Sequence, residues 1–163
     1  MTNNSEPERR RVLFLCIGNS CRSQMAEGFA RKYGADVMDV FSGGTSPAAI
    51  VQPLTKEVMA AKNVSLEGQY PKHFSVFDLD SFDIIVNMSG FKLPVRPVGD
   101  MREWEIVDPI RQSETVYIAV RDQIEGLVMR LILELRNSRR PVAPKPAENV
   151  RSRSLFRMGR RRN

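Results

Sequence analysis

A cysteine and an arginine stand close together near the start of the chain, at Cys16 and Arg22. A thiolate is a strong nucleophile, and a guanidinium can bind two oxygens of a tetrahedral oxyanion at once. Between them, Gly18 and Asn19 suit a tight turn. Ser23 follows directly, and its hydroxyl could cap a helix or donate a hydrogen bond to the sulfur. This spacing predicts a loop that binds a phosphate-like anion above a nucleophilic sulfur.

Two segments of opposite character flank this loop. Residues 12–15 read Val-Leu-Phe-Leu, which is typical of a buried parallel strand, and residues 24–33 have a helical composition. A strand, a short loop and a helix place the loop N–H groups at the positive end of the helix, where an anion binds. The alternative is that Cys16 is an inert core residue and Arg22 a solvated one. The agreement of strand, glycine, hydroxyl and helix disfavours it.

The rest of the chain alternates between strand and helix patterns. We predict further strands at 37–41, 83–88 and 104–107, and helices at 23–33 (ended by Gly34), 53–62 and 112–136. This alternation is typical of an α/β protein with a parallel sheet and right-handed crossovers. The ligand crevice of such a sheet lies at the carboxyl ends of its strands, where the Cys16 loop is expected. We predict a disordered N-terminus at 1–11, one catalytic domain at 12–137 and a basic disordered tail at 138–163.

Asp108 is the best candidate for a general acid. Attack on a phosphomonoester needs a proton donor for the leaving oxygen, and Asp108 follows the last predicted strand, at the same sheet edge as the loop. A plain Asp-Pro turn with Pro109 is the alternative. His73 is the single histidine, and it cannot complete a zinc site with two loop cysteines. We therefore predict neither a metal nor a cofactor.

At these residues the chain resembles the low-molecular-weight protein tyrosine phosphatase family, and most closely its arsenate-reductase branch. The runs 18–28, 42–48 and 104–109 carry the resemblance, which spans 12–137. It implies a doubly wound, four-stranded parallel sheet in the order 2-1-3-4, flanked by helices, and it favours the acid role of Asp108. The predicted catalytic residues are Cys16, Arg22 and Asp108, and the predicted phosphate-binding or supporting residues are Ile17, Gly18, Asn19, Ser20, Cys21 and Ser23.

Three functions are compatible with these residues. The main prediction is a phosphomonoester hydrolase that forms a cysteinyl-phosphate, acting on a phosphorylated protein or a small phosphomonoester. The alternative is an arsenate reductase that uses an external thiol. The resemblance would place two further cysteines after the third strand, but the chain has Ser89 and Leu93 there. It also has Ile110 and Arg111 where the phosphatases often have tyrosines. A phosphate-binding module without turnover is the third possibility.

The charge and the cysteine content limit the partners and the cell compartment that we expect for the protein. The net charge is +6, but nine basic residues and one glutamate follow residue 137, so the predicted domain itself is slightly acidic. The tail is suited to contact anionic surfaces. No apolar run is long enough to span a bilayer, and two cysteines cannot staple a secreted fold, so we predict a cytoplasmic protein. Cys21 either packs behind the loop or forms a reversible disulfide with Cys16.

Overall fold

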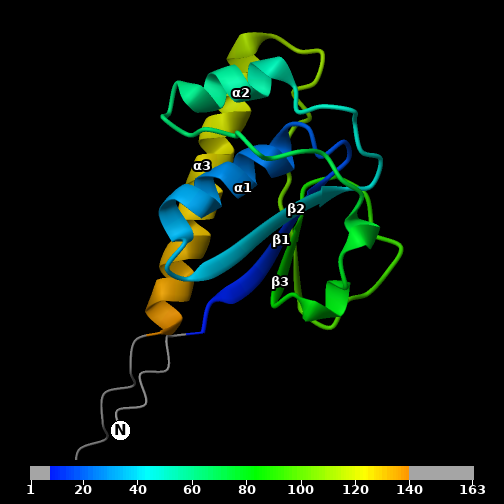
Figure 1. Ribbon diagram of the computed structural model, residues 1–163, viewed down its shortest axis with the longest axis vertical. Helices are drawn as coiled ribbons and strands as arrows, with labels where there is room; N and C mark the ends of the chain where they lie inside the picture. The colour runs from blue at the N-terminus through cyan, green and yellow to red at the C-terminus, as the bar shows by residue number, and fades with distance from the viewer. Residues whose placement is uncertain (1–7, 140–163) are drawn as a thin grey trace, which may run out of the picture.

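A four-stranded sheet forms the centre of the computed structural model, which describes residues 8–139 (Figure 1). Its strands are β1 (Arg10–Cys16), β2 (Met38–Gly44), β3 (Ile84–Asn87) and β4 (Asp100–Glu103). All neighbouring strands are parallel, and their order is β2-β1-β3-β4. The predicted α/β fold and strand order 2-1-3-4 are therefore confirmed. Most of the predicted N-terminal segment 1–11 and nearly all of the predicted tail 138–163 lie outside the described residues.

The first strand is apolar on both sides because both faces of the sheet are covered. Val12 and Phe14 pack into the cluster that the helices complete, whereas Leu13 and Leu15 pack into a second cluster on the other face. Successive side chains of a strand point to opposite faces, so a strand with two buried faces has no polar positions. Cys16 ends this strand and lies in the cluster on the helical side.

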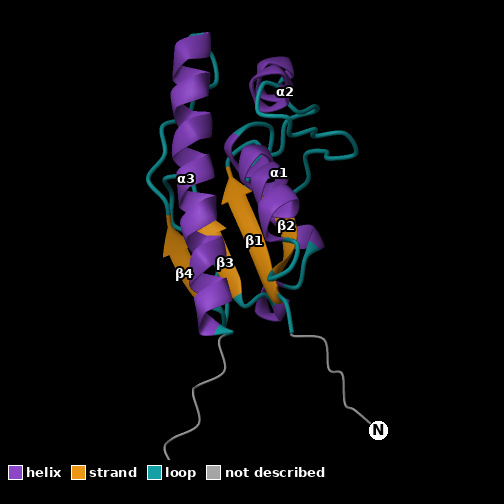
Figure 2. Ribbon diagram, turned by 90° about the vertical axis from the view of Figure 1, so that its left-hand side faces the viewer, coloured by secondary structure: helices purple, strands orange, loops and turns teal. Residues whose placement is uncertain are grey.

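The α-helices pack on one face of the sheet, and short turns cover the other. Figure 2 shows α1 and α3 side by side in front of the strands, with α2 above α1 and beside the upper part of α3. Their bounds are α1 (Arg22–Gly34), α2 (Pro53–Ala60) and α3 (Glu114–Ser138). The opposite face carries two 3-10 turns, η1 (Phe74–Val76) and η2 (Leu79–Ser81). No helix in the described part of the chain is long and apolar enough to cross a membrane.

Two local predictions were wrong. The last strand is β4, at Asp100–Glu103, and not the predicted segment 104–107. Its partner β3 ends at Asn87, which pairs with Glu103, so only the Trp104 N–H still reaches the carbonyl of Asn87, at 3.0 Å. The chain beyond it has no strand to pair with.

Gly34 was predicted to follow the last helical residue as a terminating glycine, but it is itself the last residue of α1, without a left-handed conformation, and Ala35 is the C-cap. A Cβ atom there would lie 2.8 Å from a side-chain carbon of Ile132, so the glycine lets α1 and α3 pack closely.

Candidate active site

In the loop between β1 and α1, every carbonyl oxygen of residues 16–21 accepts a hydrogen bond. Four of these oxygens accept hydrogen bonds from backbone N–H groups of the segment 45–52, at 2.8 to 3.2 Å. The Asn19 carbonyl accepts from Nε2 of Gln24 at 2.9 Å, and the Cys21 carbonyl accepts from the Met25 N–H at 2.9 Å. Among the described residues, no acceptor faces the N–H groups of residues 17–21. A run of unpaired N–H groups at a helix start forms an anion-binding concavity.

Two backbone features hold the loop in this shape. Asn19 adopts the left-handed conformation, with φ of 45°, as its residue type suggested. At Gly44, an added Cβ atom would lie 2.5 Å from the carbonyl oxygen of Ile17. Only glycine therefore lets the end of β2 come this close to the loop, and the segment that follows Gly44 can then donate to the loop carbonyls.

The sulfur of Cys16 lies beside the hydroxyl of Ser23. The Sγ–Oγ distance is 2.9 Å, and both side chains are buried. The Asn19 amide donates a hydrogen bond from Nδ2 to the same Ser23 oxygen, at 2.8 Å. Because that oxygen already accepts from Asn19, its own hydrogen is free to point at the sulfur. Of the two roles considered for Ser23, the structure thus gives it the contact to sulfur, since α1 begins at Arg22 and the capping position is Cys21.

The Arg22 guanidinium is buried and held by backbone carbonyls. Its NH1 donates to the Met88 oxygen at 2.6 Å and to the Ile106 oxygen at 3.1 Å. Its NH2 lies 3.3 Å from Oδ2 of Asp108. These carbonyls come from the chain just beyond β3 and β4, so the sheet topology fixes the guanidinium. A planar fork of several donors suits these acceptors, whereas a lysine offers one point charge.

Asp108 lies at the mouth of the site, where 41% of its side chain is exposed. Its Oδ1 accepts a hydrogen bond from the Ile110 N–H at 3.2 Å, and its carbonyl accepts from Nε2 of Gln112 at 2.7 Å. The predicted acid is therefore held on a short turn beside Arg22, with access to solvent. The structure brings Asp108 and the loop together although they are far apart in the sequence.

Cys21 is a buried residue that faces the core. Its exposed fraction is 2%, and burial raises the pKa of its thiol to about 12. Cys16 and Cys21 are both free thiols in the structure. Of the two roles considered for Cys21, packing behind the loop matches this burial, and the reversible disulfide with Cys16 stays a prediction.

Four further polar residues support the loop and lie outside the predicted set: Gln24, Glu27, Ser42 and Lys72. Ser42 accepts a hydrogen bond from Asn19 Nδ2 at 2.9 Å and donates one to Glu27 Oε2 at 2.6 Å. The Lys72 N–H donates to Asn19 Oδ1 at 3.0 Å. The available signal was weak: Gln24 and Glu27 are polar residues on the buried side of a helix. The part of the chain that is described contains no cluster of three acidic, histidine or cysteine side chains that could hold a metal.

A buried cysteine, the unpaired N–H groups of residues 17–21 and a buried arginine thus follow one another at the junction of β1 and α1. The chain belongs to the low molecular weight phosphotyrosine protein phosphatase family, whose model matches residues 11–94. It is 33% identical over 130 residues to the glutaredoxin arsenate reductase of Synechocystis sp., with 77% of this chain and 98% of the relative covered.

Solved structures agree with this assignment. One described as an arsenate reductase in the phosphate-binding state has a TM-score of 0.73 and 34% identity, covering 77% of this chain and 98% of its own. A tyrosine phosphatase from Erwinia amylovora shares the fold, with a TM-score of 0.68, but its identity is 19%, covering 80% of this chain and 96% of its own. The more similar proteins thus favour the alternative function over the main prediction of a phosphomonoester hydrolase.

Proposed function

We propose that the protein is an arsenate reductase that takes its electrons from an external thiol. The observation that carries the proposal is the set of unpaired N–H groups of residues 17–21 in the loop that begins at Cys16. Such a cradle binds a tetrahedral oxyanion through charge and shape. Similarity to proteins named as arsenate reductases then favours arsenate over a phosphomonoester as the anion that reacts.

The proposed reaction has three steps. The Cys16 thiolate forms a bond to arsenic(V), and one arsenate oxygen leaves as water after taking up protons. An external thiol then attacks the Cys16 sulfur: a mixed disulfide forms, the sulfur–arsenic bond breaks, and its electron pair reduces arsenic(V) to arsenite. A second thiol attacks the mixed disulfide and regenerates Cys16. One arsenate and two thiols thus give one arsenite, one disulfide and one water.

The thiol has to come from outside because the chain offers no suitable second one. Its only other cysteine is Cys21, whose buried thiol stays protonated up to a pKa of about 12. The segment after β3 is locked by side-chain hydrogen bonds: Ser89 donates to Asn87 Oδ1 at 2.7 Å and accepts from the Phe91 N–H at 3.1 Å. A glutaredoxin-type protein or a small thiol is the proposed donor.

The remaining site residues receive roles that follow from their positions. Arg22 neutralises the equatorial oxygens of the bound anion, and Asp108 supplies the proton to the departing oxygen. The backbone N–H groups of the loop hold the same oxygens. The proposed site set is catalytic Cys16, Arg22 and Asp108, with Ile17, Gly18, Asn19, Ser20, Cys21 and Ser23 binding the anion or supporting the loop.

Phosphomonoester hydrolysis is the second candidate. The observation in its favour is the solvent-accessible carboxylate of Asp108 beside Arg22, at 3.3 Å. The same carboxylate could protonate a leaving alcohol and then activate the water that hydrolyses a cysteinyl-phosphate. The segment 47–50, part of the stretch that donates to the loop carbonyls, has only small and aliphatic side chains, including the exposed Ile50, and offers no aromatic wall to a phosphotyrosine ring.

The domain limits and the setting are also proposed. We assign the catalytic domain to residues 12–137 and a separate contact with anionic surfaces to the basic segment that follows it, where nine basic residues stand against one glutamate. Removing residues 140–163 should then leave arsenate turnover unchanged. A reducing cytoplasm is the proposed compartment because both cysteines are free thiols.

The deciding experiment measures two products from one preparation. The purified chain is incubated with arsenate and either glutathione, glutathione plus a glutaredoxin, or dithiothreitol, and arsenite is quantified. Phosphate release from p-nitrophenyl phosphate is measured in parallel without thiol. Arsenite that requires both a thiol and Cys16, tested with Cys16→Ser, supports the proposal. Thiol-independent phosphate release without arsenite would establish the hydrolase instead, and no turnover in either assay would indicate a binding module.

A further inference from the structure

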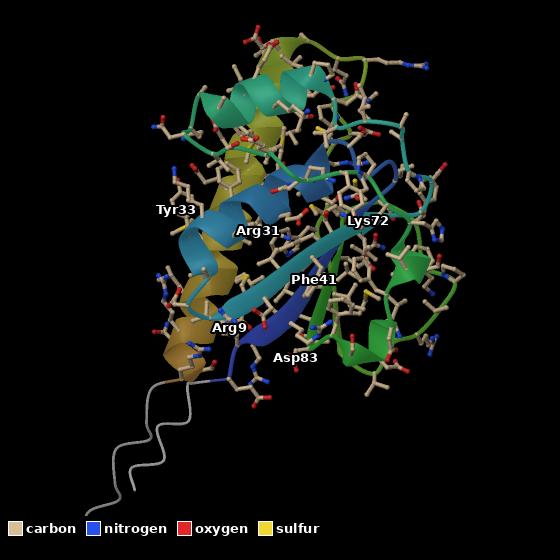
Figure 3. All side chains as sticks on the ribbon, viewed as in Figure 1. Arg9, Arg31, Tyr33, Phe41, Lys72 and Asp83 are labelled. Carbon is tan, nitrogen blue, oxygen red and sulfur yellow. The ribbon has the colours of Figure 1, made fainter. Side chains whose placement is uncertain are left out.

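Lys72 makes three hydrogen bonds at the back of the anion-binding loop, one to the loop itself and two to the end of β2. Its N–H donates to Asn19 Oδ1 at 3.0 Å, and its ammonium Nζ donates to the carbonyl oxygen of Ser42 at 3.3 Å. Its own carbonyl accepts from the Gly44 N–H at 2.9 Å. Lys72 therefore joins the carboxyl end of β2 to the loop, and Figure 3 shows it near that end of the strand.

The ammonium of Lys72 also lies in the field of a buried carboxylate. Glu27 is 3% exposed, and its Oε1 accepts a hydrogen bond from Arg31 on α1 at 2.6 Å. Burial lowers the pKa of Lys72, and the charge of Glu27 opposes that shift. The ammonium also lies 4.5 Å from the centre of the Tyr70 ring, a favourable cation–π contact. A half-buried charge with this many partners is built into the structure and is not a freely solvated side chain.

The hydrogen bonds beyond Lys72 diverge from the Asn19 amide, with one branch to Ser42 and Glu27 and the other to Ser23 and the sulfur. The Ser42 hydroxyl donates to Glu27 Oε2 at 2.6 Å. The Ser42 oxygen then accepts from Asn19 Nδ2 at 2.9 Å.

The Asn19 amide completes the path. Because Lys72 occupies Oδ1 of this amide, the side chain is held with its nitrogen toward Ser42 and Ser23. The hydrogen of Ser23 is thereby left for Cys16, whose Sγ lies 2.9 Å away.

We propose that Lys72 is a positioning residue for the Cys16 nucleophile. It acts through Asn19 and Ser42 and does not touch the substrate. Its ammonium holds the carbonyl of Ser42, whose hydroxyl bridges Glu27 and Asn19, and its backbone N–H holds Oδ1 of the Asn19 amide. The inference rests on the proposed role of Cys16 as nucleophile, but it holds whether the anion attacked is arsenate or a phosphate ester.

The test compares Lys72→Met and Lys72→Gln with a matched control, Lys56→Met. Lys56 is an exposed lysine on α2 and lies outside the site. Two rates are measured below the melting temperature of every variant. One is the alkylation of Cys16 by iodoacetamide at neutral pH, located by peptide mass spectrometry. The other is kcat and KM for arsenate with a thiol donor.

Both Lys72 variants should alkylate Cys16 about tenfold more slowly than the control, the loss expected when the one charge-assisted hydrogen bond of the ammonium, to the Ser42 carbonyl, is removed while the backbone contacts stay. The value of kcat should fall with the alkylation rate, while KM changes little because Lys72 does not contact the substrate. In Lys72→Ala, added ethylammonium should restore part of the alkylation rate, and Lys72→Arg should keep most of it.

The alkylation readout separates this inference from the proposed function because it needs no substrate. If arsenite never forms but alkylation depends on Lys72 as described, the positioning role stands and the reductase proposal fails. If the Lys72 variants alkylate Cys16 at the rate of Lys56→Met, or if they only lower the melting temperature, the positioning role is refuted. Failure of ethylammonium to act on Lys72→Ala would equally count against a role for the charge.

Discussion

Ser23→Ala isolates the contact that the structure makes between a hydroxyl and the nucleophilic sulfur. The Ser23 oxygen lies 2.9 Å from Cys16 Sγ, and the whole side chain is buried, so no water replaces the lost hydrogen bond easily. A hydrogen bond to a charged group contributes about 1.5–3 kcal/mol. Since about 1.4 kcal/mol corresponds to a factor of ten in rate, the attacking thiolate should lose about tenfold to a hundredfold in reactivity.

The fold itself should be affected much less. Asn19 Nδ2 loses the Ser23 oxygen at 2.8 Å but keeps the Ser42 oxygen at 2.9 Å, so no buried donor is left without a partner. We expect a loss of about 1 kcal/mol in the free energy of unfolding, the usual worth of one neutral hydrogen bond. Denaturant unfolding measures that loss independently of activity.

The assay follows Cys16 alkylation and arsenate turnover at neutral pH. Ser20→Ala serves as a comparison from the same loop: its hydroxyl is buried and has no hydrogen-bond partner among the described residues. Ser20→Ala should therefore lose far less than Ser23→Ala. Equal rates in the two variants would refute the argument that the Ser23 hydroxyl stabilises the sulfur.

Three further predictions follow from the site. Arg22→Lys should lower arsenate turnover about a hundredfold to a thousandfold, because one ammonium cannot bind Met88, Ile106 and the anion together; kcat near the parent value would contradict this. Asp108→Asn should reduce any hydrolysis of p-nitrophenyl phosphate about a hundredfold or more, and an unchanged rate would exclude it as the acid. For Cys21, burial raises the thiol pKa from 9.0 to about 12, so the unfolded chain ionises first as pH rises. Stability should therefore be fully present below about pH 9 and fall toward about pH 12, and Cys21→Ala should fall less steeply in denaturant unfolding across that range. Parallel slopes would show that this thiol does not contribute.

The sequence pattern predicted β1 and the loop after it well, because the burial and the turn conformation there depend on residues close together in the chain. The run Val12 to Leu15 is apolar since both faces of β1 are covered, and that burial is visible in the sequence itself. The left-handed turn at Asn19 and the contact between Ser23 and Cys16 also follow from residue types within one short loop. The strand order depended on the family resemblance, since the alternation of elements fixes parallel pairing but not which strand lies at the centre.

What could not be predicted depends on distant partners. The segment 104–107 has the composition of a strand, yet β3 ends at Asn87 and leaves it unpaired. Gly34 looks like a helix terminator from its residue type, but its position is set by Ile132, on another helix. Lys72 is separated from Asn19 by three elements, α1, β2 and α2, and nothing in its neighbours along the chain marks it as part of the site. Long-range pairings of this kind leave no local pattern.

The tethering of every carbonyl between residues 16 and 21 has a consequence for selectivity. Because its carbonyls are already hydrogen-bonded, the loop is preorganised before an anion binds. Its N–H groups recognise only the charge and the tetrahedral shape of the anion. Inorganic phosphate should therefore occupy the loop almost as readily as arsenate and compete for it in the cell. Discrimination would then come after capture, because phosphorus bound to sulfur cannot be reduced by thiols, whereas arsenic can.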